Sequence, residues 1–270
     1  MRRVLAAAGA LAAFVALLFP LAVALLGSLR PEEQLFAGAL FEWTPVVLDH
    51  YRAVLQERNL LLPLRNSLVV AVATTALCLV VGAGCAYALA RLRFRGRAAV
   101  LACVLATTLF PQISLVSPLY LLLRSLGLLH TYPGLVLPYL TFALPLTIWL
   151  LTAAFRDLPP ELEEAARLDG AGRLRVLLEI VLPVAAPALA AVGIITFVTC
   201  WNEFLFALSF TLGPERQTLP VAIALFRGQY QVPWGEVLAA SMVATLPVAA
   251  LVLGLQRRIV RGLTSGAVEG

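Results

Sequence analysis

Charged residues divide this chain into long apolar runs. Each run is about as long as the roughly 20 residues that a helix needs to cross the hydrocarbon core of a bilayer. Six runs contain no Asp, Glu, Lys or Arg, and they cover residues 4–29, 66–90, 98–123, 125–155, 180–202 and 237–256. The pattern therefore predicts an all-α integral membrane protein with six transmembrane helices.

Composition supports a membrane protein, because 61% of the residues are hydrophobic and only 13% are charged. All twenty basic residues are arginine. Six spans place thirteen arginines on the side that holds both termini and seven on the other side. Because arginine-rich loops stay inside the cell, we expect a multi-pass protein of the inner cell membrane with both termini cytoplasmic. This topology accounts for the net charge of +5 without a nucleic-acid partner.

The same pattern predicts the organisation of the chain. Its parts are a first transmembrane helix (1–29), an external segment (30–65) that is helical around 48–56, a core of five spans (66–256) and a cytoplasmic tail (257–270). The first run is longer than the apolar part of a typical signal peptide, which favours a retained span. The core contains a cytoplasmic loop (156–183) and a second external loop (213–235). We expect His50 and His130 to be solvated, and the four cysteines to be small packing residues without metal or redox spacing.

The longest charged segment between spans is residues 161–183. Pro159 and Pro160 suit the first turn of a helix, and the acids that follow suit its positive end. Gly170 is placed to end this helix in a left-handed conformation, and a second short helix over 173–182 is expected to close at Pro183. A solvated loop explains the charge of this segment, but it does not explain the adjacent alanines Ala165 and Ala166 or the position of Gly170. The segment therefore favours a docking site.

The second and third spans contain small and polar residues. Gly82 and Gly84 are expected to let helices approach closely. The third span contains prolines and the polar residues Gln112, Ser114 and Ser117, which is typical of a helix that lines a pathway. Ordinary helix packing with a proline kink explains the same residues equally well.

Here the residues point to a known family. Glu164-Ala165-Ala166, Gly170, Ile180 and Leu182-Pro183 match every fixed position in the signature of membrane subunits of binding-protein-dependent ABC importers. The chain also resembles the maltose- and trehalose-type sugar permeases over most of its length. The stretches that carry this resemblance are 65–71, 90–97, 110–129, 141–151, 201–208 and 262–268.

The resemblance implies a type I importer core in which the 161–183 loop couples the chain to a separate ATPase. The coupling residues would be Glu164, Ala165, Ala166, Asp169, Gly170, Ile180, Leu182 and Pro183. Expected partners are a second, different permease subunit, two ATPase subunits and an extracytoplasmic sugar-binding protein. The 213–235 loop matches in position a loop that reaches into the binding protein in this family, and a plain connecting loop is the alternative. The expected substrate is a disaccharide α-glucoside such as trehalose or maltose; an oligosaccharide or glycerol phosphate is the alternative. The tail resembles one that extends between ATPase subunits, although Glu269 replaces the usual lysine.

Two other features bear on the mechanism. A phosphate-binding loop needs a lysine, so this lysine-free chain is not expected to hydrolyse ATP; ATP and Mg²⁺ would bind the partner ATPase, and this chain would hold no cofactor. Trp201, Asn202 and Glu203 offer stacking and hydrogen bonds to a sugar, and Glu203 is the one acid that interrupts a span. However, Glu203 follows Pro183 by about 30 Å of helix, which favours a place at the outer interface, bonded to a neighbouring helix. An ion-coupled carrier is less favoured, because it needs an acid near the membrane centre.

Overall fold

The computed structural model describes residues 2–36, 45–226 and 232–265, and the regular elements in these ranges are helices. The external segment 30–65 and the loop 213–235 are therefore described in part, and Glu269 lies outside the described residues. The chain forms two compact units, residues 1–64 with 219–247 and residues 65–218 with 248–270.

The first unit contains α1 (Arg2–Ser28), η1 (Glu32–Gln34), α2 (Asp49–Arg52), a π-helical turn η2 (Ala53–Glu57), α12 (Leu219–Ala224) and the start of α13 (Trp234–Ser265). The Glu32 carboxylate accepts hydrogen bonds from the backbone amides of Trp234 and Gly235, each at 2.8 Å. His50 Nε2 lies 2.8 Å from the Arg30 carbonyl oxygen, and its ring packs on Gly235. The expectation of a solvated His50 was wrong, because its ring is half-buried, bonds the Arg30 carbonyl oxygen and occupies space that a side chain at position 235 would need.

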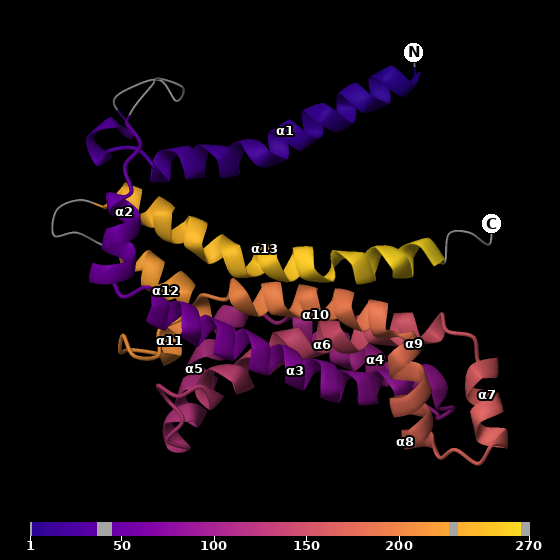
Figure 1. Cartoon of the computed structure of the whole chain (residues 1–270). Coiled ribbons are helices and arrows are strands. Elements are labelled where there is room, and N and C mark those ends of the chain that lie inside the picture. Colours follow the sequence, from indigo (N-terminus) through magenta and orange to yellow (C-terminus); the bar gives the residue numbers. More distant parts are fainter. Residues whose placement is uncertain (1, 37–44, 227–231, 266–270) are drawn as a thin grey trace. The chain divides into compact units, whose positions relative to one another are not determined.

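The second unit contains the site. Its elements are α3 (Leu61–Arg91, from residue 65), α4 (Arg97–Ala106), η3 (Thr107–Leu109), α5 (Gln112–Ser125), α6 (Pro133–Arg156), α7 (Glu161–Leu168), α8 (Arg173–Val176), the π-helical turn η4 (Leu177–Val181), α9 (Leu182–Val184), α10 (Ala186–Trp201), α11 (Leu205–Phe210) and the end of α13. In Figure 1, α3, α6 and α10 run along one another, with α7 and α8 at one end and α5 and α11 toward the other.

Four described helices are long and apolar enough to cross a membrane, and two bent helix pairs bring the number of spans to six. The first bent pair is the third predicted span, which turns by 93° between Leu109 and Gln112. Pro111 accounts for the break, because a proline forces the residue before it out of the helical conformation, and Phe110 is extended (φ −70°, ψ 128°). With each bent pair taken as one span, the described residues form six spans, two of which are sharply bent.

The second bent pair corrects the expected end of the short helix after Gly170. Pro183 does not close this helix; the chain continues through α9 to Val184 and turns by 80° before Ala186. The π-helical turn η4 ends at Val181, two residues before Pro183, and such local widening re-satisfies the backbone groups that a proline frees. Pro187 then occupies the first turn of α10, where a missing amide hydrogen costs nothing.

Close packing between α3 and α6 depends on Gly82. A Cβ at Gly82 would lie 2.8 Å from Thr147 Cγ2, whereas one at Gly84 would meet nothing within 4 Å. The expectation of close approach is therefore confirmed at Gly82 and wrong at Gly84, which faces away from α6. Thr147 also shares a 3.0 Å hydrogen bond with Thr196 of α10, which ties a third helix to the same level.

Candidate functional site

The α7–α8 loop is a helical corner made by Gly170. Gly170 has φ +81°, a left-handed conformation that side-chain-bearing residues rarely adopt, as the sequence predicted. Its amide donates to the Arg167 carbonyl oxygen, and the Ala171 amide donates to that of Ala166 at 2.9 Å. This pair of bonds satisfies carbonyls at the end of α7. The chain can therefore turn within four residues from α7 into α8.

A buried ion pair fixes α7 to the end of α3. Glu163 is 4% exposed, and its Oε1 lies 2.6 Å from Arg91 Nε. Tyr87 of α3 donates a 3.1 Å hydrogen bond to the other carboxylate oxygen, and Arg91 donates to the Leu158 carbonyl oxygen at 2.7 Å. Arg167 is a more distant partner, 3.6 Å from Glu163. The carboxylate thus has a charged and a neutral partner on α3.

Sequence reasoning did not single out Glu163 or Arg91. It gave the orienting charge to the adjacent Glu164, which the structure places on the exposed face of α7. Glu163 and Ala166 are three residues apart and so share a helix face, which the structure buries. Their spacing does not tell which face of α7 is buried, so no sequence signal singled out Glu163.

An apolar core continues from the spans into the loop. Its members come from α3, α6, α7, α8, η4 and α10, and include Ala83, Ala86, Tyr87, Leu151, Phe155, Ala166, Val176, Leu177, Val181, Ala185 and Val192. The half-buried Ile180 and Leu182 pack against its edge. The loop is therefore a continuation of the packed helices rather than a tether between them.

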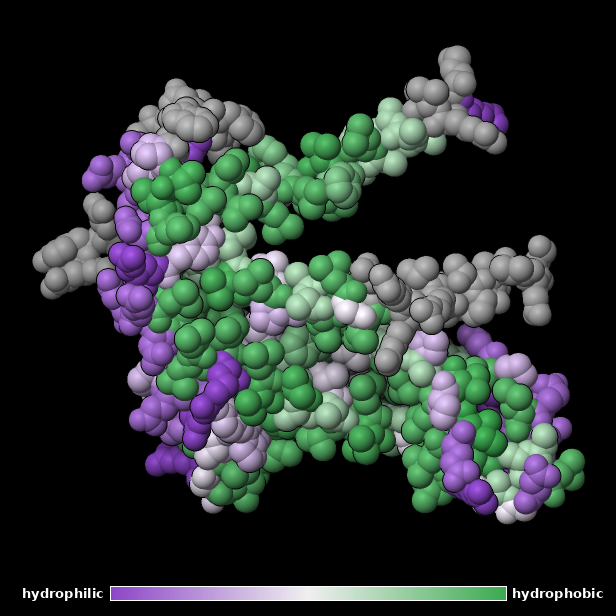
Figure 2. Space-filling model, viewed as in Figure 1, coloured by the Kyte–Doolittle hydropathy of each residue, from purple (hydrophilic) through white to green (hydrophobic). Residues whose placement is uncertain are grey.

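The outer face of the loop is exposed and partly apolar. Leu168, at the end of α7, is 90% exposed, and Leu174 on α8 is 69% exposed. Ala165 and Asp169 are exposed on the same loop, as is Pro183 on α9, so the alanine pair divides: Ala166 packs inward and Ala165 faces outward. Figure 2 shows hydrophilic and hydrophobic side chains interleaved over α7 and α8. A face of this kind is typical of protein contacts.

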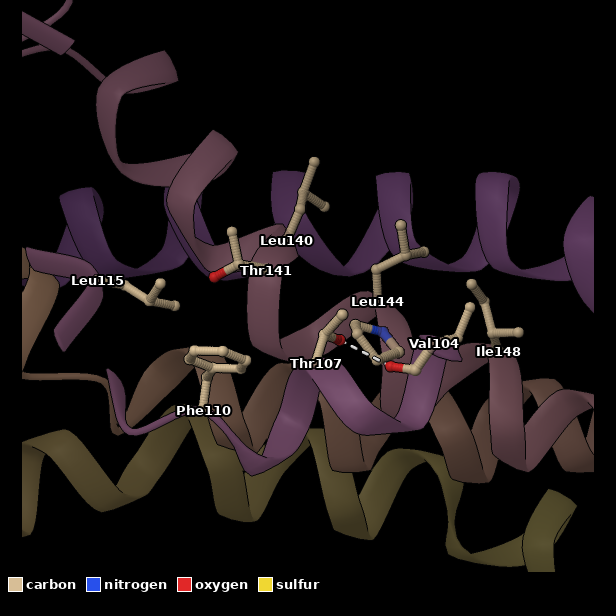
Figure 3. Close-up of a pocket in the computed structure, with 9 residues that line it drawn as sticks. Val104, Thr107, Phe110, Leu115, Leu140, Thr141, Leu144 and Ile148 are labelled. Atoms are coloured by element: carbon tan, nitrogen blue, oxygen red, sulfur yellow. Dashed lines mark hydrogen bonds between the residues drawn. The ribbon is translucent and has the colours of Figure 1, made fainter. Parts of the chain in front are cut away.

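The break in the third span borders an apolar cavity of about 480 Å³ (Figure 3). Val104, Thr107, Phe110, Leu115, Leu140 and Ile148 are among its lining residues. The hydroxyl of Thr107 donates to the Val104 carbonyl oxygen at 2.7 Å, and that of Thr141 donates to Pro138 at 2.6 Å. Because its hydroxyls are already bonded within their own helices, this cavity offers apolar contact rather than sugar recognition.

The residues predicted to line a pathway lie on α5, at the end of α10 and in the turn that follows it. Gln112 is half-buried, and Ser114 and Ser117 are exposed; these three residues are outside the lining of the apolar cavity. Trp201 is 4% exposed and stacks on Phe197 with 5.6 Å between ring centroids. Trp201 therefore has a packing partner within α10.

Asn202 and Glu203 face differently from Trp201. Asn202 is exposed, and its amide donates to the Val198 carbonyl oxygen at 2.9 Å. Glu203 is buried and accepts hydrogen bonds from the Phe206 amide at 2.7 Å and the Ala207 amide at 3.1 Å. Its carboxylate thus caps the start of α11, the helix that follows it in the chain. Trp201, Asn202 and Glu203 do not converge on one point.

A hydrogen-bonded cluster holds residues 212–217 at the other end of the second unit. The Asn66 amide donates to the carbonyl oxygens of Glu215 at 3.0 Å and Gln217 at 2.9 Å. Tyr132 donates to Asn66 Oδ1 at 2.7 Å, and Arg216 lies over the Tyr132 ring. Partial burial raises the pKa of Tyr132, but Arg65 and Arg216 lower it by more, so the net pKa is lowered.

His130 belongs to the same end. Its Nδ1 accepts a 3.1 Å hydrogen bond from the Leu212 amide, and its own amide donates to the Phe210 carbonyl oxygen. The ring is exposed, as expected, and it also has a structural partner. Sequence alone gave no sign of this contact, because the partner lies 82 residues away.

Comparison with known proteins identifies the family. Residues 78–265 match the model of the binding-protein-dependent transport system inner membrane component. The chain belongs to this family. The matched residues include the whole α7–α8 loop, the broken third span and α10.

Individual relatives agree with this family. The chain is 44% identical to the trehalose transport system permease protein SugB of Mycobacterium tuberculosis, over 90% of this chain and 89% of the relative. It is 38% identical to the trehalose/maltose transport system permease protein MalG of Thermococcus litoralis, over 100% and 98% of the two chains. It is also 39% identical to the sulfoquinovosyl glycerol transport system permease protein SmoH of Agrobacterium fabrum, over 94% and 89%. These relatives are permease subunits, and the chain is a multi-pass protein of the inner membrane.

The fold agrees with solved importers. A chain of a bacterial ABC transporter for the acidic polysaccharide alginate superposes with a TM-score of 0.77 at 24% identity, covering 94% of this chain and 95% of that one. A chain of the MetNI methionine ABC transporter gives a TM-score of 0.58 at 19% identity, covering 72% and 91%. The all-α permease fold is therefore shown.

Proposed function

We propose that the chain is a membrane subunit of an ATP-driven sugar importer, that it forms half of the translocation pathway, and that its α7–α8 loop is the contact with a separate ATPase. The observation that carries this proposal is the structure of the loop. Glu163 and Ala166 hold its inner face, and its outer face is left unfilled, with Leu168 90% exposed. Burial of an exposed leucine in a partner's groove contributes about 1.5–3 kcal/mol.

The residues on the outer face suit close contact. Ala165 is small enough for another backbone or side chain to approach, and Glu164 supplies a charge that selects one orientation. Gly170 keeps the corner sharp, which presents Leu168 and Asp169 at its tip. Ile180, Leu182 and Pro183 lie further along, on η4 and α9, and join this corner to α10.

The α7–α8 loop is connected to the spanning helices by direct side-chain packing, so a force on the loop is transmitted to them. The apolar core is shared among α3, α6, α7, α8, η4 and α10, so a shift of α7 cannot leave the three spanning helices unmoved. ATP-driven closure of the partner subunits would therefore move the spans outward-open, and hydrolysis would return them. This two-state cycle needs no titratable group in the bilayer. Glu203, the acid that an ion-coupled carrier would use, already has both carboxylate oxygens bonded to α11.

The partners follow from what this chain lacks. It contains no lysine for a phosphate-binding loop, so we place ATP, Mg²⁺ and hydrolysis on two ATPase subunits. A second, different permease subunit completes the pathway, and an extracytoplasmic sugar-binding protein delivers the substrate. The excess of arginine on the side of α7 and α8 supports cytoplasmic termini.

The proposed substrate is a disaccharide α-glucoside. The relatives named for trehalose and for trehalose/maltose support this class. The relative named for sulfoquinovosyl glycerol keeps open another solute of the same importers, such as an oligosaccharide or glycerol phosphate. The proposed pathway contacts that are at least partly open to solvent are Gln112, Ser114, Ser117 and Asn202. Trp201 is buried in α10, and Glu203 is buried against the start of α11.

A pair of proline variants tests the coupling role. Gly170→Pro removes the left-handed corner, because proline fixes φ near −65°. Gly172→Pro is the matched control, since Gly172 already has φ −70°. We expect Gly170→Pro to stay in the membrane, to lose at least tenfold in trehalose uptake and to release the ATPase during purification, while Gly172→Pro keeps both. Ala165→Trp should also release the ATPase. Wild-type uptake by Gly170→Pro and Ala165→Trp would refute the coupling role.

A further inference from the structure

A second cavity of the same unit lies where the turn between α3 and α4 faces the α7–α8 loop. Its volume is about 660 Å³, within the range of about 300–1,000 Å³ that small-molecule sites occupy. Its wall is polar, in contrast to the cavity beside the broken span. Half of the ten lining residues are arginines, namely Arg91, Arg93, Arg97, Arg167 and Arg173, and two more are Glu163 and Glu164.

The charges in this cavity do not cancel. Arg91 is matched by Glu163 at 2.6 Å, and Arg167 lies 3.6 Å from the same carboxylate. Arg93, Arg97 and Arg173 come from the turn, from α4 and from α8, and the ion pairs found among the described residues do not include them. With Glu164 counted, the lining carries three more positive than negative charges. The cavity therefore favours an anion with several acceptor oxygens.

Arginine indicates which anion fits. A guanidinium group presents planar donors that match the oxygens of phosphate in pairs. Three such groups, from three different elements, surround one cavity. Glu164 opposes an anion, but its exposed side chain can turn toward Arg167 or solvent.

The place of the cavity indicates where the phosphate comes from. Residues 91–97 separate two charge-free runs, 66–90 and 98–123, so these arginines stand where two membrane-crossing segments leave the hydrocarbon. Lipid phosphates lie at this level, and basic pockets between membrane helices bind anionic head groups. A partner protein would have to insert an acidic side chain into the same space.

We propose that this cavity binds the phosphate head group of an anionic phospholipid, and that Arg93, Arg97 and Arg173 are its ligands. Because Arg173 belongs to α8 and Arg93 to the turn after α3, a bound head group would link the α7–α8 loop to the bilayer surface. This binding requires only insertion in the membrane. It does not rest on the proposed contact with an ATPase.

The test is lipid retention by the full-length chain, purified in neutral detergent with its co-purifying subunits. Native mass spectrometry would count bound phosphatidylglycerol against added phosphatidylcholine. Arg93→Gln, Arg97→Gln and Arg173→Gln should each lower phosphatidylglycerol affinity about fivefold, and the triple variant about a hundredfold, because one arginine near the surface contributes about 1 kcal/mol. Arg156→Gln is the matched control; Arg156 is an exposed arginine at the end of α6, outside the cavity lining. It should change affinity less than twofold.

Three results would overturn the proposal. The first is equal phosphatidylglycerol affinity in the triple variant and the wild type. The second is a wild type that binds inorganic phosphate at millimolar concentration but does not bind phosphatidylglycerol, which would indicate that the ligand is a soluble anion. The third is a triple variant that keeps its lipid and loses a co-purifying subunit, which would indicate an acidic protein partner.

A measurement on the wild-type protein tests the proposal even if the variants fail to fold. Photoactivatable phosphatidylglycerol in nanodiscs should label peptides that contain residues 91–97 and 167–173 more than the peptide around Arg156. Labelling of these peptides no stronger than that around Arg156 would also overturn the proposal.

Discussion

The two ends of α3 are held by different chemistry. At one end Arg91 and Tyr87 bind the side-chain carboxylate of Glu163, and the partner helix α7 keeps its outer face exposed. About 38 Å away along the helix, the Asn66 side chain binds two backbone carbonyl oxygens of residues 215–217. The first attachment fixes one side of a helix. The second fixes the path of the chain itself.

This difference fits two different tasks. A helix held by one buried ion pair and an apolar face can shift as a rigid body while its outer side engages a partner. A segment held through its carbonyl groups keeps one conformation. We therefore expect stability at the α7 end to depend on the charge of Glu163, and stability at the other end to depend on the side-chain amide of Asn66.

The largest expected effect is at the α7 end. Glu163→Gln leaves Arg91, whose side chain is only 12% exposed, without a close counter-charge. The free energy of unfolding of the second unit should therefore fall by about 3 kcal/mol, measured by thermal melting in detergent. Glu164→Gln, on the adjacent exposed acid, is the control and should change it by less than about 0.5 kcal/mol.

A double variant separates lost charge from lost shape. Arg91→Met with Glu163→Leu replaces the pair with apolar groups of similar size and should recover most of the loss. If Glu163→Gln melts like the wild type, the buried ion pair does not hold α7.

A smaller effect is expected at the Asn66 end. Asn66→Ala leaves the carbonyl oxygens of Glu215 and Gln217 without these donors, which should cost about 2 kcal/mol. Hydrogen exchange should speed up at the amides of residues 213–218 and remain unchanged in α7. Asn202→Ala is the control, because the Asn202 amide bonds only within its own helix turn. Equal exchange rates in both variants would remove the contrast between the two ends.

The smallest effect is expected midway along α3. Gly82→Ala would push a methyl group toward Thr147 and should lower stability by about 1 kcal/mol, as overpacking does. Gly84→Ala, where a Cβ meets nothing within 4 Å, should be neutral or slightly stabilising. A greater loss in Gly84→Ala than in Gly82→Ala would show that α3 faces α6 with another side.

Local rules predicted the parts of the fold that depend on short stretches of sequence. Apolar length located the spans, and Gly170 marked the corner because no other residue adopts its conformation as readily. The prolines of the third span allowed a kink, but the break at Pro111 and its 93° angle depend on how α4 and η3 pack on α6 and how α5 packs on α11. The prediction that the helix ends at Pro183 was wrong, because the π-helical turn η4 before this proline lets the helix continue to Val184.

The candidate site shows where such rules stop. Glu163 and Glu164 are adjacent acids of identical chemistry, and only the contact of α7 with α3 decides which is buried. Asn66 finds its partners about 150 residues later in the chain. Neither pairing has a spacing that a sequence pattern can reveal. Composition likewise identifies an arginine-rich turn at 91–97 but not the cavity that it forms with α7 and α8.

The most direct test of the coupling role is a photo-crosslink from the tip of α7. A benzoylphenylalanine in place of Leu168 should form an adduct with an ATP-hydrolysing subunit, identified by peptide mapping, in complexes that retain trehalose uptake. The same probe in place of Leu121, 60% exposed on α5, should not. Active complexes in which position 168 forms no ATPase adduct would contradict the account. So would a Leu168→Cys variant whose thiol reacts with a maleimide that is confined to the outside of the cell.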